Sequence, residues 1–413
     1  MSEAETFGEL LARANRENID GNPAGAIEQL NRALIQSPGN PSALNMMGLI
    51  LMNGGRHGDA VAAFERAVTS DPGAPPLWLN LGTALEKAGR PKDALGALDK
   101  GLECDPYYLP ALLKKGQLYE ALGQSDLAVR SYRAVLQALP ATGGLPPEFD
   151  QALARGRALV ADDARQRRER LGAIDGLANV SGSGAKAYLD QICGLRQVYA
   201  PAPTGPHFPF LPAPEFFDRD LFPWFDRLEA GVEAIRDELL DLWREDAPGF
   251  EPYIQYDPTK PLNQWVELNK SPRWSAYSLW TSGMREEANC SRCPRTAEIL
   301  AGLPLLDIPG KGPAVMFSIL APKTRIPPHT GTTNIRSVVH LPLVVPDGCG
   351  FRVGGEIRQW VEGEAWAFDD TIEHEAWNDS DRPRAILIID VWNPYLSEAD
   401  RDVVRLSAPE IRL

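Results

Sequence analysis

The first third of the chain carries a repeat with a period of 34 residues, which restricts its fold more than any other feature. Proline lacks the N–H that a helix interior needs, so one proline in each period would end a helix. Glycine would form the turn between two helices, and small residues would let paired helices approach closely. The residues that recur at this spacing are Pro38, Pro72, Pro106 and Pro140; Ala26, Ala60, Ala94 and Ala128; Gly21, Gly55, Gly89 and Gly123; Gly48, Gly82 and Gly116; and Leu44, Trp78 and Leu112.

The repeat unit resembles the tetratricopeptide repeat. It has the segment "WLNLG" from Trp78 to Gly82, a small residue that opens the second helix, and a terminal proline. Such units stack to bury a continuous core and leave one concave face, so we expect an all-α solenoid over residues 1–140. The resemblance implies docking of a peptide or protein, or self-association, and does not distinguish between these partners.

The charge of the chain argues against nucleic acid as a partner, and its hydropathy argues against a membrane span. A net charge of −14 repels phosphates, and the strongest basic run, "RQRRER" from Arg165 to Arg170, is expected to be a solvated helix face. No segment is long and apolar enough to span a bilayer, and the acidic N-terminus lacks the apolar stretch of a secretory signal. We therefore expect neither nucleic acid as a partner nor a membrane span.

The cysteines are few and odd in number, which does not suit a disulfide framework and favours the reducing cytoplasm. Cys290 and Cys293 have the Cys-x-x-Cys spacing, but no second Cys pair or Cys/His pair lies nearby to complete a zinc site. We expect incidental thiols there, with a redox role or a disulfide between them as the alternatives.

A helical cap and a linker are expected over residues 141–204. One charged helix should run from about Phe149 to Leu171 and another to about Val198, with "VSGSGAK" between them. The stretch that follows is so rich in proline that it should be extended. The boundary of a second domain, residues 205–413, is therefore expected near residue 200.

The second domain is predicted to be a β-structure with flanking helices. It opens with one amphipathic helix packed on a flat surface, whose apolar residues are Phe225, Leu228, Val232, Ile235, Leu239 and Leu242. After Trp265 the pattern changes to strand-length apolar segments bounded by Gly, Pro or Asp, including "AVMFSILAP", "IRSVVHLPLVV", "GFRVGG", "IRQWVEG", "EAWAFDD", "EHEAWND" and "RAILIIDVW". This many short strands indicates a sandwich or barrel of the jelly-roll kind. The expected fold class is α+β multidomain.

Three of the five histidines fall within a short segment of this domain. His329 follows two prolines in a run typical of turns, whereas His340 lies in an apparent buried strand and His374 in a later one. A jelly roll would bring His329 beside His374 on the facing sheet, and neutral imidazole is a favoured ligand of iron, zinc, copper and nickel. The alternative is a core that holds satisfied imidazoles.

The usual iron triad also needs a carboxylate two residues after the first histidine, and that position is Gly331. A metal site would then have two histidines, unless a carboxylate comes from elsewhere. The nearest acids, which could orient the ring of His374, are Asp369, Asp370, Glu373 and Glu375. Glu373 and Glu375 alternate with His374 and should point to the opposite face of its strand.

Three segments resemble the aspartyl/asparaginyl β-hydroxylases over roughly residues 205–397. They are "WSAYSLW", "HTGTTNIRSVVHLPLVVPDGCGFRV" and "WVEGEAWAFDDTIEHEAWNDSDRPRAILIIDVWNP". The resemblance implies a double-stranded β-helix that binds Fe(II) through two histidines, with glycine in place of the carboxylate and 2-oxoglutarate as cosubstrate. Several members of the family also carry tetratricopeptide repeats upstream.

The resemblance also implies roles for individual residues. His329 and His374 resemble the iron ligands, and Arg384 resembles the arginine that holds the far carboxylate of 2-oxoglutarate. The other residues that match positions near the cosubstrate are Trp274, Ser318, Arg336 and His340. Animal enzymes have a second arginine where this chain has Val338, which bears on peptide specificity. The alternatives are a core histidine for His340, a surface ion pair for Arg384 and ordinary packing for Trp274.

The expected activity is hydroxylation of an Asp- or Asn-like side chain of a peptide or protein recruited by the repeats, with O₂ and 2-oxoglutarate consumed. One alternative keeps this chemistry and changes the substrate to a free amino acid, a lipid or a small metabolite. Another is a non-catalytic scaffold in which the repeats carry the function. Neither a Walker-type loop nor a Gly-x-Ser-x-Gly elbow is present, so nucleotide and serine hydrolase chemistry are unsupported.

Overall fold

The computed structural model describes residues 5–139, 145–177, 183–244, 249–256 and 264–410. The chain divides into two compact units, Met1–Leu195 and Arg196–Leu413. Each unit has its own buried apolar core, as expected for a chain of this length.

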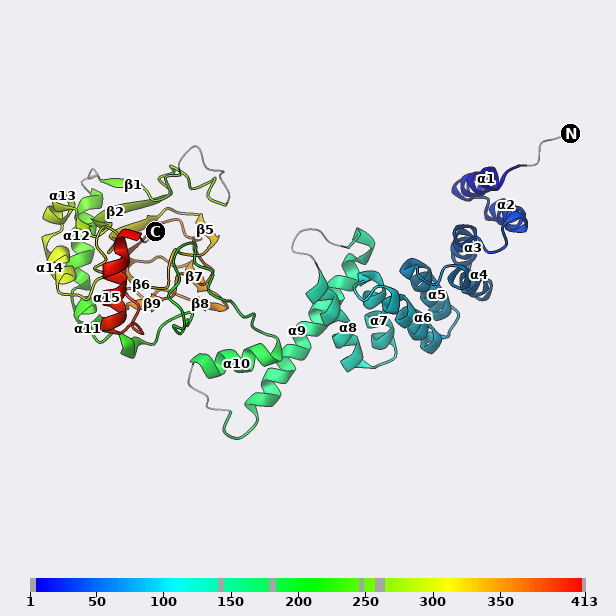
Figure 1. The fold of residues 1–413 in the computed structure, drawn as a ribbon, viewed down its shortest axis with the longest axis horizontal. Helices are drawn as coiled ribbons and strands as arrows, with labels where there is room; N and C mark the ends of the chain where they lie inside the picture. Colours follow the sequence, from blue (N-terminus) through cyan, green and yellow to red (C-terminus); the bar gives the residue numbers. More distant parts are fainter. Residues whose placement is uncertain (1–4, 140–144, 178–182, 245–248, 257–263, 411–413) are drawn as a thin grey trace. The chain divides into compact units, whose positions relative to one another are not determined.

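The first unit is the predicted tetratricopeptide solenoid. Eight of its helices form four antiparallel pairs that stack in chain order (Figure 1). The pairs are α1 (Phe7–Ile19) with α2 (Pro23–Gln36), α3 (Pro41–Asn53) with α4 (His57–Ser70), α5 (Pro75–Lys87) with α6 (Pro91–Cys104), and α7 (Leu109–Ala121) with α8 (Ser125–Ala138). The predicted fold of this part is confirmed.

The recurring small residues have the packing roles that their spacing predicts. A Cβ built on Gly48 would lie 2.6 Å from the ring of Phe64, so only glycine lets α3 and α4 approach this closely. Gly55, between the same helices, has φ of +76°, which glycine adopts without strain. Ala60 is fully buried at the start of α4.

Helix α9 (Asp150–Gly172) closes the last repeat. It packs on α8, and the ring of Tyr132 lies between two glycines. A Cβ built on Gly116 of α7 would lie 2.7 Å from this ring, and one on Gly156 of α9 would lie 2.5 Å from it. Helix α10 (Ser183–Cys193) follows and contacts α9. The chain then runs as an extended proline-rich segment from about residue 197.

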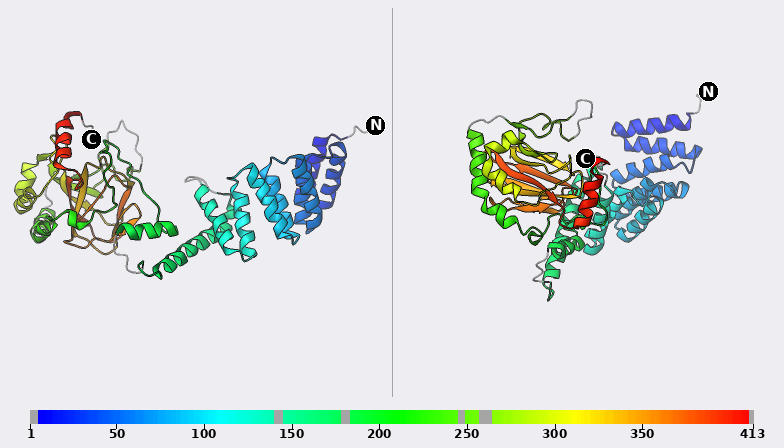
Figure 2. Two further views of the ribbon diagram at one scale, coloured as in Figure 1. Left: turned by 60° about the horizontal axis from the view of Figure 1, so that its bottom comes forward. Right: turned by 60° about the vertical axis from the view of Figure 1, so that its left-hand side comes forward.

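The second unit contains two antiparallel sheets, and the predicted jelly-roll arrangement is confirmed (Figure 2). The larger sheet has the order β1-β2-β4-β11-β6-β9, with β3 paired to β2, and the smaller has the order β5-β10-β7-β8. The larger sheet is formed by β1 (Phe250–Pro252), β2 (Trp274–Thr281), β3 (Met284–Arg285), β4 (Val315–Leu320), β6 (Arg336–Val344), β9 (Trp366–Phe368) and β11 (Arg384–Trp392). The smaller is formed by β5 (Thr324–His329), β7 (Cys349–Val353), β8 (Glu356–Arg358) and β10 (His374–Asn378).

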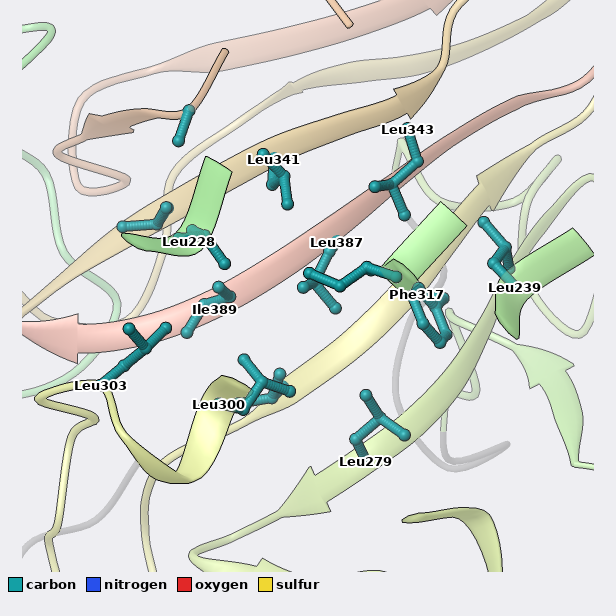
Figure 3. Close-up of a cluster of buried hydrophobic side chains, with 14 of the residues drawn as sticks. Leu228, Leu239, Leu279, Leu300, Leu303, Phe317, Leu341, Leu343, Leu387 and Ile389 are labelled. Atoms are coloured by element: carbon teal, nitrogen blue, oxygen red, sulfur yellow. The ribbon is translucent and has the colours of Figure 1, made fainter. Parts of the chain in front are cut away.

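Helices cover the outer face of the larger sheet (Figure 2, right). They are α11 (Phe225–Ala230), α12 (Val232–Arg244), α13 (Glu287–Arg292) and α14 (Pro294–Ala301), while α15 (Glu398–Ser407) follows the last strand. Figure 3 shows how Leu228 and Leu239 of these helices pack against strand residues such as Phe317 and Leu387. This apolar layer leaves the inner face of the sheet free for a site.

Several sequence predictions about this unit were wrong in detail. The amphipathic helix expected from Phe225 to Leu242 is two helices, α11 and α12, separated at Gly231, where a Cβ would lie 2.5 Å from Ile299 of α14. His329 does not lie in a turn but ends β5, which tolerates Pro327 and Pro328 because it is an edge strand. Among the helices that the structure describes, none has the length and apolarity needed to cross a bilayer.

Candidate functional site

All seven residues singled out from the sequence line one cavity of about 250 Å³ in the second unit. They come from both sheets, since β2, β4, β6 and β11 belong to the larger sheet and β5 and β10 to the smaller. These residues are Trp274, Ser318, His329, Arg336, His340, His374 and Arg384. The fold thus gathers side chains that are up to 110 positions apart in the sequence.

His329 and His374 form a cross-strand pair. They face each other in the register of β5 and β10, and their ring centroids are 4.1 Å apart. The two histidines therefore lie on neighbouring strands of the same sheet, and the expectation that they come from facing sheets was wrong. Direct pairing places two imidazoles closer together than strands on opposite sheets would allow.

Both imidazoles are held in the same tautomer by backbone carbonyls. Nδ1 of His329 lies 2.8 Å from the carbonyl oxygen of Pro327, and Nδ1 of His374 lies 2.9 Å from that of Ile372. A carbonyl can only accept, so each Nδ1 carries the hydrogen and each Nε2 keeps a free lone pair. Burial lowers the pKa of His329 to about 3 and that of His374 to about 4. Two neutral imidazoles with free Nε2 atoms are suited to bind a transition metal.

A carboxylate lies beside this pair at the place where the usual iron triad would have its acid. A Cβ built on Gly331 would overlap the side chain of Asp370, which therefore fills the space of any side chain at position 331. Oδ2 of Asp370 accepts a hydrogen bond of 2.8 Å from Arg336, while its buried Oδ1 has no partner among the described residues. Asp370 is thus an acid from elsewhere in the chain that adjoins the histidines.

Arg336 is bound by two carboxylates. One Nη donates to Asp370 and the other donates to Oδ2 of Asp390 at 2.8 Å. Burial on its own lowers the pKa of Arg336, but the two carboxylates raise it overall, so the side chain stays charged. Both terminal nitrogens of Arg336 are therefore engaged within the protein.

Arg384 is a buried cation that has no anionic partner in the described part of the chain. Arg384 is the first residue of β11 and is 1% exposed. Its Nε and one Nη have no hydrogen-bond partner among the described residues. Its guanidinium carbon lies 4.9 Å from the ring centre of Trp360. Burial lowers the pKa of Arg384 to about 10, because the surroundings disfavour the charge. A buried guanidinium of this kind is suited to bind a carboxylate through two parallel hydrogen bonds. Arg384 does not form the surface ion pair considered from the sequence with any described residue.

Ser318 lies on β4, the strand next to Arg384. Its Oγ accepts a hydrogen bond of 3.1 Å from the indole N–H of Trp274, and both side chains are buried. Since the oxygen accepts this bond, the hydroxyl hydrogen remains available to donate to a bound anion. The ring of Trp274 also stacks on Tyr253 at 4.0 Å between centroids, which fixes the indole.

His340 on β6 is not a satisfied core histidine. It is 5% exposed, its Nδ1 has no hydrogen-bond partner in the described chain, and its ring packs against Phe351 and Phe368. Burial lowers its pKa well below the ordinary value, so the ring is neutral. One ring nitrogen is thus left to bind a ligand in the cavity.

The cavity residues that were not singled out from the sequence include Tyr253, Trp360 and Asp390. Trp360 was expected on a strand, but it follows β8, and its buried Nε1 has no partner among the described residues. Asp390 could have been found from the sequence, because its carboxylate interrupts the apolar strand "RAILIIDVW". No local pattern marks Tyr253 or Trp360.

The other acids near His374 and the two cysteines of the Cys-x-x-Cys segment do not line the cavity. Glu373 and Glu375 bind Arg352 on the other face of β10, as strand alternation predicts. Within the described ranges, no group of three or more His, Cys, Asp or Glu side chains is arranged to share a metal ion. Cys290 and Cys293 are unpaired and fully buried, and burial raises the pKa of Cys293 to about 12, which does not suit a reactive thiolate.

Comparisons with known proteins agree with both units. Residues 229–394 match the family model described as Aspartyl/Asparaginyl beta-hydroxylase. Tetratricopeptide repeat models match residues 10–75, 45–108 and 110–142. Among solved structures, that of MamA protein is 22% identical and covers 43% of this chain and 99% of its own, with a TM-score of 0.33.

Two curated relatives differ in the substrates that their names state. The human aspartyl/asparaginyl beta-hydroxylase is 40% identical over 182 residues, which are 43% of this chain and 24% of the human protein. The ornithine lipid ester-linked acyl 2-hydroxylase of Rhizobium tropici is 33% identical over 191 residues, which are 45% of this chain and 63% of that protein. The chain thus spans less than two thirds of either relative. Residues 229–394 thus match the aspartyl/asparaginyl β-hydroxylase family model, and the segments that match tetratricopeptide repeats precede them in the chain.

Proposed function

We propose that the second unit is an Fe(II)- and 2-oxoglutarate-dependent hydroxylase. The observation that carries the proposal is one cavity that contains a pair of neutral histidines with free Nε2 atoms and a buried arginine without an anion. The histidine pair is suited to bind a metal cation, and the buried arginine is suited to bind a carboxylate. The hydroxylase family of residues 229–394 supports the same reaction class.

In this proposal His329 and His374 would hold the iron, and Arg384 would hold the far carboxylate of 2-oxoglutarate. When bound, iron, 2-oxoglutarate and O₂ supply the oxidising chemistry, which yields succinate and CO₂ and inserts one oxygen atom into a substrate C–H bond. The hydroxyl of Ser318 would donate to the same carboxylate, with Trp274 fixing its oxygen. His340 and Trp360 offer further nitrogen atoms toward the cosubstrate.

Arg336 and Asp370 would position the two histidines that hold the metal. The ion pair of Arg336 with Asp370 holds a carboxylate beside the histidines. Its Oδ1, which has no partner among the described residues, is placed to accept a hydrogen bond from a water molecule. Apolar side chains including Ile326, Phe351 and Phe368 line the rest of the cavity and would exclude bulk water.

The substrate we favour is an Asp- or Asn-like side chain of a polypeptide that the repeats recruit. The human relative named aspartyl/asparaginyl beta-hydroxylase and the presence of repeats support this substrate. We place the protein in the cytoplasm, because all five cysteines are unpaired.

A second substrate class is favoured by Val338. This residue is 6% exposed and lines the cavity where animal enzymes have a cation, so the cavity offers an apolar wall there. A lipid acyl chain would suit such a wall, and the relative named an ornithine lipid acyl 2-hydroxylase points the same way.

The test is succinate formation by the purified full chain with Fe(II), ascorbate and 2-oxoglutarate. We expect His329→Ala and His374→Ala each to abolish iron-dependent succinate release and to abolish Co²⁺ binding followed by its visible absorption. Full turnover in both variants would refute the proposal. Stimulation of succinate release by Asp- and Asn-containing peptides or by ornithine lipid distinguishes the two substrate classes.

A further inference from the structure

Asn378 is a fully buried amide at the end of the strand that carries His374. It is the last residue of β10, is 0% exposed, and does not line the cavity. Burying a polar side chain costs free energy unless hydrogen bonds satisfy its donor and acceptor groups. The partners of Asn378 therefore indicate which parts of the fold this side chain holds together.

The amide nitrogen of Asn378 binds the larger sheet. Its Nδ2 donates to the carbonyl oxygens of Leu320 at 3.0 Å, Ala321 at 3.2 Å and Arg382 at 2.8 Å. Leu320 ends β4 and is the register partner of Arg384, and Arg382 precedes Arg384 by two positions. One side chain of the smaller sheet thus holds the backbone on both sides of Arg384.

The amide oxygen of Asn378 fixes the loop that leads from β10 to β11. Oδ1 accepts hydrogen bonds from the backbone N–H of Ser380 at 3.1 Å, from the hydroxyl of Ser380 at 2.6 Å and from the thiol of Cys349 at 3.3 Å. A backbone N–H can only donate and a carbonyl can only accept, so the orientation of the amide is determined by its partners. Neither aspartate nor leucine, which have a similar shape, could make both sets of hydrogen bonds.

The two sheets that Asn378 joins hold opposite ends of the candidate site. His329 and His374 lie on β5 and β10 of the smaller sheet, whereas Arg384 lies on β11 of the larger sheet. In the proposed function, 2-oxoglutarate reaches from the metal to Arg384 and so crosses from one sheet to the other. The length of the acid that fits therefore depends on how far apart the sheets are held at this end.

We propose that Asn378 is a positioning residue that sets the distance between the two metal-binding histidines and Arg384, and thereby selects the chain length of the cosubstrate. This inference rests on the proposed function. Asn378 lies four positions after His374 on one strand, and its amide bonds the backbone two positions before Arg384. A binding constellation must be held to within about 0.5 Å, so loss of these hydrogen bonds should displace the anchor enough to affect binding.

The experiment measures how 2-oxo acids bind to the full chain loaded with Co²⁺, which stands in for iron. Calorimetric titration compares 2-oxoglutarate with oxaloacetate, which is one methylene shorter, and with 2-oxoadipate, which is one methylene longer. Pyruvate is the fourth acid, because it lacks the far carboxylate and does not reach Arg384. We expect the wild type to bind 2-oxoglutarate about tenfold or more tightly than the other three.

Asn378→Ala should weaken 2-oxoglutarate binding about tenfold and 2-oxoadipate binding less than about threefold, because the anchor is no longer held at one distance. Pyruvate should bind this variant as it binds the wild type. A general loss of stability would weaken the binding of all four acids alike, so the pattern separates positioning from a purely structural role.

Asn393→Ala is the matched control. Asn393 is also 0% exposed, follows the other end of β11, and donates through Nδ2 to the carbonyl oxygen of Asn334 at 2.9 Å. It lies outside the cavity lining. This variant should lose a comparable set of buried contacts and keep the wild-type preference among the acids.

Ser380→Ala decides the question if Asn378→Ala does not fold. It removes one hydrogen bond to Oδ1 of Asn378 from a half-buried loop residue and leaves β10 unchanged, so the preference for 2-oxoglutarate over 2-oxoadipate should narrow about threefold.

The inference is overturned if the folded variant of Asn378, or Ser380→Ala in its place, keeps the wild-type ratio of 2-oxoglutarate to 2-oxoadipate affinity. It is also overturned if pyruvate binding weakens as much as 2-oxoglutarate binding, or if Asn393→Ala narrows the ratio equally. A wild-type chain that binds no 2-oxo acid would refute the proposed function itself, and the inference with it.

Discussion

The side chain of Asp370 fills the space that any side chain at position 331 would need. A Cβ on Gly331 would overlap the carboxylate of Asp370, which is 4% exposed and bound to Arg336. The backbone N–H of Gly331 also donates to the carbonyl of Asp370 at 2.6 Å, so the two loops are tied together. A carboxylate side chain at position 331 would therefore have to displace that of Asp370.

The first prediction concerns this overlap. Gly331→Asp should lower the free energy of unfolding by ~1–3 kcal/mol, because the new side chain must displace a buried, ion-paired carboxylate. The double variant Gly331→Asp/Asp370→Ala removes the obstacle and should recover part of that stability and bind Co²⁺ more tightly than the single variant. Urea unfolding and Co²⁺ titration measure the two effects. Equal stability of the single variant and the wild type would contradict the overlap.

The second prediction separates binding from stability at Arg384. Arg384→Met removes a buried charge that no described residue neutralises, so the cosubstrate-free protein should unfold at a higher temperature than the wild type. The same change should weaken 2-oxoglutarate binding about 30-fold or more, corresponding to ~2 kcal/mol. Calorimetric titration and thermal melts with and without 2-oxoglutarate measure both. A variant that loses stability and keeps its affinity would contradict the proposed role of Arg384.

The third prediction concerns Trp360. Trp360→Phe keeps an aromatic ring beside Arg384 but removes a buried N–H that donates to no described residue. We expect about tenfold weaker 2-oxoglutarate binding, the value of one hydrogen bond to a charged group. Trp366→Phe is the matched control, because Trp366 also has a buried N–H with no partner within the described ranges but does not line the cavity. Unchanged affinity in Trp360→Phe, or an equal loss in Trp366→Phe, would argue against this role.

The fourth prediction is a pH dependence of stability. Burial keeps His340 neutral in the folded chain, whereas in the unfolded chain it takes up a proton below about pH 6.5. The unfolded state then binds more protons, so stability is complete above about pH 6.5 and falls as the pH drops further. Replacing this residue in His340→Gln should reduce the slope by up to ~1.4 kcal/mol per pH unit.

The measurement for this prediction is urea unfolding of chelator-treated wild type and variant, followed by tryptophan fluorescence. All ten tryptophans except Trp78 lie in the second unit, so the signal reports on the domain that contains His340. Asp369 and Asp390, whose pKa values burial raises, contribute an opposite slope in both proteins and cancel in the difference. Identical slopes in the two proteins would contradict the prediction.

The parts of the fold that produce a local pattern in the sequence could be predicted. The 34-residue period records the same packing contact in every repeat, as with Gly48 against Phe64, so it identifies both helices and their pairing. The alternation of short strands predicted the jelly roll, and the resemblance pointed to His329, His374 and Arg384, which the structure brings into one cavity.

The rest depends on contacts between distant segments. The pairing of β5 with β10 joins residues 45 positions apart, and the sequence of neither strand identifies the strand that it pairs with. Pro327 and Pro328 argue locally against a strand, and only the edge position of β5 makes them acceptable. The overlap of Asp370 with position 331 and the place of Trp360 beside Arg384 are likewise set by three-dimensional packing.

Tyr132 lies at the C-terminal end of the array of repeats, where its packing leaves no place for a further repeat. Its ring occupies one slot between glycines of α7 and α9, and α9 stands where the first helix of another repeat would have to dock. Gly156 lies 40 positions after Gly116, outside the period of 34, so duplicating a repeat at this junction would not recreate the slot. The length of the solenoid is therefore encoded at its C-terminal end, and evolution could add repeats more readily ahead of α7 than after α8.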